Sequence, residues 1–230
     1  MIRLLPLLIA AGYALIIVVP PLFYDVDGIP PEAYQALVYT ALASTISTSS
    51  TLPPAILLSF YGVRRKLSII IPITTFSTAI PHTALGLLLL PLYSSIGLVD
   101  TSLAIITSMM IVCLPIGVGA MTSMFSASNK ALDEFLQPLG VGDLRIIRLY
   151  MACAARPVIT AAILMWLRGF SELGVFLIVA QRPPTVGVYL YEVFLKAGAS
   201  SAVPLALLLA LTGFIFSTSL YLAMANVRDR

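Results

Sequence analysis

Two opposite charges lie within an otherwise apolar segment of this sequence. Arg168 and Glu172 are four residues apart, so a helix places both side chains on one face. Charged side chains at membrane depth are costly, and they usually face the interior of a helix bundle or a water-filled cavity. Two interpretations follow. Either the pair is structural and locks this helix to its neighbours, or Arg168, Glu172 and the small-residue turn with Ser171 and Gly174 line the path of an anion.

Hydroxyl side chains are crowded into two other apolar segments, residues 44–51 and residues 74–78. Ser and Thr often join helices within membranes, which favours a packing role. A polar lining for a hydrated anion is the alternative interpretation. His82 is the only histidine, and we expect it to be a hydrogen-bond donor inside the bundle, because no second metal ligand stands at suitable spacing.

No combination of residues predicts an enzyme. Cys113 and Cys153 form no CxxC motif and no His/Cys cluster that could hold zinc or a redox centre. An intramembrane enzyme that used Glu172, His82 or Ser171 would need a nucleophile, a base and an orienting group at recognisable spacing, and the sequence has none. We therefore expect no catalytic residue, no metal ion and no cofactor.

The composition indicates that these residues are positioned by membrane helices. Of the 230 residues, 60% are apolar and 10% are charged, and the mean hydropathy is +1.03. Soluble domains are about one-half apolar and one-quarter charged. Because a crossing needs about 20 apolar residues, the sequence predicts an all-α integral membrane protein in contact with lipid, a single transmembrane domain over residues 1–230 with about six transmembrane helices. The apolar runs are 4–23, 37–61, 67–93, 102–125, 154–180 and 202–226.

Basic residues predict the orientation of these helices. In a six-helix count, most of the Lys and Arg residues outside the apolar runs fall on one side, and the positive-inside rule makes that side the cytoplasm. We therefore expect a multi-pass protein of the cell membrane with cytoplasmic N and C termini. The net charge of +3 is small and scattered, so no nucleic-acid partner is expected. The residues concerned are Arg3, Arg64, Arg65, Lys66, Lys130, Arg145, Arg148, Arg228 and Arg230.

A long cytoplasmic loop, residues 126–150, has a helical pattern of its own. Apolar residues recur at helical spacing from Ala131 to Leu139, and polar residues take the other face, which predicts a short amphipathic helix ending at Gly140. One interpretation is a helix that lies flat in the membrane interface. The other is a helix that binds a cytoplasmic partner.

The pattern of this loop favours the second interpretation. The loop resembles the EAA loop of ATP-binding-cassette (ABC) importer permeases. The resemblance rests on Glu134, on Gly140 and on the Arg-bearing stretch that leads to residues 154–157. Phe135 and Leu136 replace the two alanines of that family. The resemblance implies a bundle like that of type I ABC importer permeases, and a coupling helix in which Glu134, Phe135, Leu136 and Gly140 contact the ATPase subunits.

The segment 170–175, which reads Phe-Ser-Glu-Leu-Gly-Val, resembles the corresponding segment of the molybdate and tungstate permeases, with Leu173 in place of the usual Phe. Sulfate and thiosulfate permeases are close relatives of that family. The resemblance implies translocation of an oxyanion. Tungstate or molybdate is the first candidate substrate, and sulfate or thiosulfate is the alternative. It also implies a homodimer of the permease and an extracytoplasmic solute-binding protein.

ATP hydrolysis is expected on a separate chain. The phosphate-binding motif G-x-x-x-x-G-K-[ST] does not occur in the sequence, so we expect a non-catalytic transport subunit that pairs with an ABC ATPase dimer. A stand-alone secondary transporter is the alternative from another class. Such proteins tend to have inverted repeats and paired broken helices, and neither is evident in the sequence.

Overall fold

The computed structural model describes residues 4–23, 28–128, 135–136 and 138–226, and every regular element within these ranges is a helix. This confirms the all-α prediction. In chain order the elements are α1 (Leu4–Val18), η1 (Pro20–Phe23), α2 (Pro31–Arg64), α3 (Ile70–Thr75), η2 (Phe76–Ala79), α4 (His82–Ser95), α5 (Ser102–Ala127), α7 (Asp143–Cys153), α8 (Ala155–Phe170), α9 (Phe176–Val179) and α10 (Val186–Asn226).

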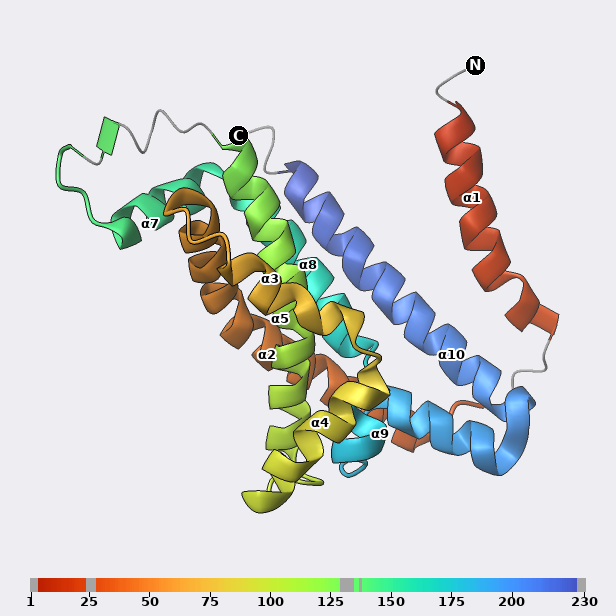
Figure 1. The fold of residues 1–230 in the computed structure, drawn as a ribbon. Coiled ribbons are helices and arrows are strands. Elements are labelled where there is room, and N and C mark those ends of the chain that lie inside the picture. The colour runs from red at the N-terminus through yellow and green to blue at the C-terminus, as the bar shows by residue number, and fades with distance from the viewer. Residues whose placement is uncertain (1–3, 24–27, 129–134, 137, 227–230) are drawn as a thin grey trace.

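Three helices, α2, α5 and α8, pack together at the centre of the molecule (Figure 1). Their backbones come close at Gly117 of α5, where an added Cβ atom would lie 2.6 Å from Met165 Sδ and 2.9 Å from the Cβ of Ala55. Small residues permit such close contact between membrane helices. The positions of α2 and α8 relative to α5 are therefore fixed by packing at this point.

Some of the hydroxyls of α2 serve this packing. Ser59 Oγ donates to the backbone oxygen of Val118 at 3.0 Å, and Trp166 Nε1 donates to Thr45 Oγ1 at 3.0 Å. These bonds join α2 to α5 and to α8, as the packing interpretation predicts. The buried hydroxyls of this helix are those of Thr40, Ser44, Ser47, Thr48, Thr51 and Ser59.

The expected continuous helix over residues 67–93 is wrong. The α3–η2 segment and α4 meet at an angle of 110°. The cause is the Ile80-Pro81 sequence, because a residue before proline avoids the helical region of φ and ψ. Ile80 has an extended backbone with φ −91° and ψ 125°.

Three other predicted bounds are also wrong. The helix expected over residues 154–180 ends at Phe170 and resumes at Phe176, and within this break the Glu172 carboxylate accepts a hydrogen bond from the backbone N–H of Val175. The last helix begins at Val186 rather than at residue 202, and it is interrupted at Gly198, whose φ of 81° suits glycine. The second helix begins at Pro31, a position that proline favours.

Two helical stretches within the described ranges, Ser102–Ala127 and Val186–Leu220, are long and apolar enough to cross a membrane by themselves. The bent pairs α3–η2 with α4 and α7 with α8 raise this number to four when each pair forms one crossing. Large apolar side chains are exposed on α4 and α10, among them Leu88 and Phe214. These features support a membrane protein, and the six crossings stay a prediction.

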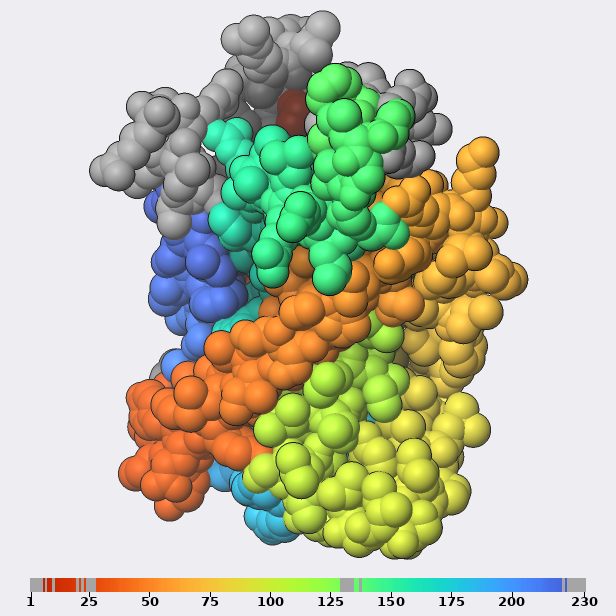
Figure 2. All heavy atoms as spheres, turned by 90° about the vertical axis from the view of Figure 1, so that its left-hand side faces the viewer, coloured from red at the N-terminus to blue at the C-terminus, as the bar shows by residue number. Residues whose placement is uncertain are grey.

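A further helix, α7, lies across one end of the bundle and meets α8 at 89° (Figure 1). Ile146, Ile147 and Tyr150 form its buried face, and the Tyr150 ring packs edge-on against Phe125 of α5 at 5.7 Å between centroids. Figure 2 shows α2 crossing this side of the molecule diagonally, with α7 above it and α4 and the first turns of α5 below it. The last part of the loop 126–150, from Asp143 on, is thus packed against the bundle as part of α7.

Candidate functional site

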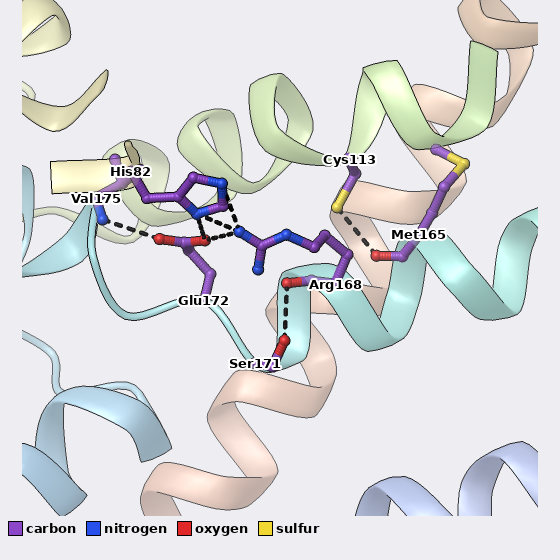
Figure 3. A network of polar contacts seen from close by, with 7 residues as sticks. All are labelled: His82, Cys113, Met165, Arg168, Ser171, Glu172 and Val175. Carbon is purple, nitrogen blue, oxygen red and sulfur yellow. Dashed lines mark hydrogen bonds and ion pairs between the residues drawn. The ribbon is translucent and has the colours of Figure 1, made fainter. Parts of the chain in front are cut away.

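Arg168, Glu172 and His82 meet where two helices are broken (Figure 3). Arg168 lies in the last turn of α8, and Glu172 lies in the break between α8 and α9. His82 is the first residue of α4, directly after the bend at Pro81. The two breaks therefore bring three ionisable side chains together from parts of the chain that are 86 and 90 residues apart.

The contacts within this network are short. Arg168 Nη2 donates to Glu172 Oε2 at 2.7 Å, and it lies 2.8 Å from His82 Nε2. The other ring nitrogen, His82 Nδ1, lies 2.5 Å from Glu172 Oε2 and also contacts Arg168 Nη2.

The Glu172 carboxylate is the buried centre of the network. This residue is 1% exposed, and its second oxygen, Oε1, accepts a hydrogen bond from the backbone N–H of Val175 at 2.9 Å. A buried carboxylate is costly unless it is paired and hydrogen-bonded. Both of its oxygens are occupied by groups of the protein, so Glu172 holds Arg168, His82 and the start of α9 in place.

The other two residues predicted beside this pair occupy different surroundings. Gly174 lies against the first turn of α4, where an added Cβ atom would be 2.9 Å from the Cβ of His82 and 3.2 Å from the backbone nitrogen of Thr83. Ser171 is exposed, and its hydroxyl donates to the backbone oxygen of Arg168 at 3.3 Å. Gly174 is therefore part of the junction, whereas Ser171 ends helix α8.

A cavity of about 240 Å³ adjoins the network. Arg168 and His82 form one part of its wall, and Ser77 and Thr78 of η2 also line it. Leu85 of α4 and two residues of α5, Val112 and Ile116, complete an apolar part of the wall. Ser77 and Thr78 belong to the hydroxyl-rich segment 74–78, for which a polar lining was the alternative interpretation, whereas His82 was expected only as a hydrogen-bond donor inside the bundle.

The predicted coupling residues lie partly within the described chain. Glu134 lies outside the described residues. Phe135 and Leu136 have helical conformation, Phe135 is 67% exposed, and Leu136 packs against the cluster that contains Phe125. Gly140 has a φ of 68°, a conformation typical of a residue that follows a helix end.

Two arginines at the end of α2 hold the ends of the loop 126–150. Arg64 Nη2 donates to the backbone oxygen of Ser128 at 2.9 Å. Arg65 makes two hydrogen bonds to the carboxylate of Asp143, one of them from Nε to Oδ2 at 3.2 Å. Asp143 lies at the start of α7, outside the long apolar helices, and its hydrogen bond with Arg65 lowers the pKa of its carboxyl below the ordinary value.

The described residues contain no group of three or more His, Cys, Asp or Glu side chains that could hold a metal ion. Cys113 is buried, with its Sγ 3.0 Å from the backbone oxygen of Met165, whereas Cys153 is exposed. Within these parts of the chain, the ionisable residues that converge on the two helix breaks are Arg168, Glu172 and His82, and they form hydrogen bonds and ion pairs with one another.

Comparison with known proteins shows similarity to archaeal transport proteins. The chain is 30% identical over 185 residues to the molybdate/tungstate transport system permease protein WtpB of Pyrococcus abyssi, which covers 80% of this chain and 74% of the relative. It is 30% identical over 131 residues to WtpB of Thermococcus kodakarensis, covering 56% of this chain and 53% of the relative. WtpB of Methanocaldococcus jannaschii is 26% identical over 187 residues, which covers 76% of this chain and 75% of the relative.

No family model matches the sequence. The aligned region with the Pyrococcus abyssi protein nevertheless extends over most of both chains, and the apolar helices fit a membrane subunit. The chain belongs to the family of permease subunits of ABC transport systems that includes these molybdate/tungstate permeases.

Proposed function

We propose that this chain is the membrane-spanning permease subunit of an ABC importer that carries tungstate or molybdate across the cell membrane. The observation that supports this most is the 30% identity over 185 residues to a protein named as a molybdate/tungstate permease. A site with a guanidinium group and hydroxyls beside a cavity suits an oxyanion of this class. Sulfate or thiosulfate is the second candidate substrate.

We propose three partners for this chain. An ABC ATPase dimer would bind the loop 126–150, with Glu134, Phe135, Leu136 and Gly140 as coupling residues. The exposed Phe135 supports this, because large aromatic side chains are common anchors of interfaces. An extracytoplasmic solute-binding protein would deliver the oxyanion, and a second copy of the permease would complete the pathway as a homodimer.

The loop is suited to transmit movement into the membrane helices. Arg64 and Arg65 tie Ser128 and Asp143 to the end of α2, and Tyr150 packs against Phe125 of α5. A rigid-body movement of the ATPase would therefore shift α2 and α5 together. Within the bundle we propose that Arg168, Ser171, Glu172 and Gly174 belong to the walls of the path, and that Gly174 and the buried Glu172 support the other two.

We further propose six crossings, formed by α1, α2, the bent α3–α4 segment, α5, α8 with α9, and α10. The basic residues then place both termini and the loop 126–150 in the cytoplasm. Polar residues of α2 explain why this helix is less apolar than a typical crossing, since its hydroxyls are buried between helices.

Purification and reconstitution test the proposed function. The tagged chain is extracted with a mild detergent, proteins that purify with it are identified by mass spectrometry, and bound tungsten, molybdenum and sulfur are measured. The assembly is then placed in liposomes, and tungstate uptake is measured with and without ATP. ATP-dependent uptake with an ATPase and a binding protein supports the proposal. Uptake by the chain without any ATPase would indicate a secondary transporter instead.

A further inference from the structure

We propose that the cavity between η2, α4, α5 and α8 binds the oxyanion inside the permease, with Arg168 and Ser77 as the main ligands. This inference rests on the proposed transport of an oxyanion. The cavity volume of about 240 Å³ is below the roughly 300–1,000 Å³ of pockets for drug-sized ligands, so it suits a small ion.

The arrangement of donors favours an anion over a cation. Glu172 is 1% exposed and does not line the cavity, and its oxygens accept from Val175 and pair with Arg168 and His82. The cavity therefore presents N–H and O–H groups without a free carboxylate from this network. A cation would find no charged ligand there, whereas an oxyanion would accept hydrogen bonds.

Arg168 is held in a position that leaves part of its guanidinium group available. Within the described residues, the hydrogen bonds and ion pairs of this group all involve Nη2, which contacts Glu172 and His82 (Figure 3). Its Nε and Nη1 groups make no hydrogen bond to the described residues, and Arg168 is about one-quarter exposed at 25%. Glu172 thus acts as a positioning residue that fixes the guanidinium group for a ligand.

Two further groups strengthen the site. The Ser77 hydroxyl makes no side-chain hydrogen bond within the described part of the chain, whereas the neighbouring Thr78 hydroxyl donates to the backbone oxygen of Thr75 at 2.7 Å. The first turn of α4 begins at His82 without a side-chain cap, so its backbone N–H groups add positive potential beside the cavity. Broken membrane helices with N-terminal ends at a substrate site occur in other transporters.

The site is suited to brief occupancy. Because Glu172 offsets the charge of Arg168, the anion would be held by hydrogen bonds and a partly compensated cation rather than by a strong unpaired charge. A pathway needs binding that is strong enough for entry and weak enough for release. The uncharged ligand Ser77 and the apolar wall of Leu85, Val112 and Ile116 fit this requirement.

ATP-driven uptake by the complete transporter tests the site. The wild-type permease and two variants, Ser77→Ala and Arg168→Lys, are reconstituted with their own ATPase and binding protein, and tungstate uptake and ATP hydrolysis are measured at saturating tungstate. Ser77→Ala removes one hydrogen bond and should lower uptake per ATP about 3- to 10-fold. Arg168→Lys keeps the pairing charge for Glu172 but loses the planar donor group, and should lower it about 10-fold or more.

Ser95→Ala is the matched control, because the Ser95 hydroxyl at the far end of α4 bonds only to the backbone oxygen of Leu92 within the described residues, at 2.8 Å. Its uptake should equal that of the wild type. Wild-type uptake per ATP in both Ser77→Ala and Arg168→Lys would overturn the site while leaving the proposed function intact. Failure of the wild-type transporter to take up tungstate, molybdate or sulfate would overturn the proposed function and the oxyanion site together.

Discussion

A Cβ atom on Gly174 would lie 2.9 Å from the Cβ atom of His82, so the break between α8 and α9 rests directly on the start of α4. The added Cβ atom would also lie 3.2 Å from the backbone nitrogen of Thr83. A Cβ atom and a backbone nitrogen cannot move aside as the end of a flexible side chain can. We expect Gly174→Ala to destabilise the protein by about 1–3 kcal/mol through overpacking. Thermal unfolding of the purified protein in detergent measures this as a lower Tm.

Gly119→Ala in α5 provides the control for this substitution. An added Cβ atom there meets nothing within 4 Å, and alanine is the better helix former by about 0.5–1 kcal/mol. The Tm of Gly119→Ala should be unchanged or slightly higher. Equal Tm values for Gly174→Ala and the wild type would show that the two breaks are not tightly packed.

The ion pair between Arg168 and Glu172 predicts a cost for the loss of one partner. Glu172→Gln leaves the guanidinium group without its carboxylate in a partly buried place. Removal of one member of a fully buried pair costs about 3–5 kcal/mol, and we expect about 2 kcal/mol here. The smaller value reflects solvent screening, since the Arg168 side chain is 25% exposed. The free energy of unfolding of the single and double glutamine variants of Arg168 and Glu172 measures the coupling.

The pair of Glu192 and Lys196 is the matched control, because its members are also four residues apart and 2.9 Å from each other, and Glu192 also lies 3.6 Å from the exposed Arg182. Glu192→Gln should cost less than about 1 kcal/mol, since the Lys196 side chain is 72% exposed. A similar loss of stability in both pairs would contradict the structural importance of Glu172. In the double glutamine variant, the two losses should be less than additive, because both single changes break the same contact.

The features of this site that depend on residues close together in the sequence could be predicted from the sequence. The spacing of Arg168 and Glu172 places both on one helical face, and the structure has the ion pair at 2.7 Å. The apolar composition likewise indicated an all-helical membrane protein. These inferences need only the helical repeat and the cost of burying charge.

The role of His82 could not be derived in this way, because its partners are 86 and 90 residues away. The bend at Pro81 brings it to Arg168, and although the proline marks a break in the helix, the sequence gives neither the angle of 110° nor the residues that the bend brings together. Gly174 similarly looked like part of a small-residue turn, and only the position of α4 shows why a side chain does not fit. α7 was missed as a separate helix because its apolar positions were read as part of a basic connecting stretch.

Substitutions of Gly140 and Gly142 should differ in their effect on the coupling of ATP hydrolysis to uptake. An added Cβ atom meets nothing within 4 Å at either position. Gly140 has a φ of 68°, so Gly140→Ser should cost about 1 kcal/mol and disturb the end of the proposed coupling helix. Gly142 precedes α7 with φ −68° and ψ 151°, where serine is a favoured cap. Uptake per ATP in the reconstituted transporter should fall for Gly140→Ser and stay at the wild-type level for Gly142→Ser. Equal uptake per ATP in both variants would show that the conformation of Gly140 has no part in coupling ATP hydrolysis to uptake.

The pairing of Asp143 with Arg65 predicts a dependence of stability on pH. The hydrogen bond from Arg65 lowers the pKa of Asp143 in the folded protein. The pair therefore stabilises the fold at pH values above the unfolded pKa of about 4, and this contribution is lost as the pH falls through the lowered folded pKa. The amount should be under about 1 kcal/mol, because both side chains are partly exposed.

Asp143→Asn isolates this contribution, because asparagine keeps the shape of the side chain and does not titrate. Thermal unfolding of both proteins is followed from pH 7 to pH 3 (about the range over which an aspartate loses its charge). The wild type should be more stable than the variant at pH 7, and the difference should shrink as the pH falls below the ordinary value for aspartate. Added salt should reduce the difference at pH 7, since the pair is partly screened. A difference in Tm that is the same at both ends of this pH range would show that Asp143 holds α7 without its charge.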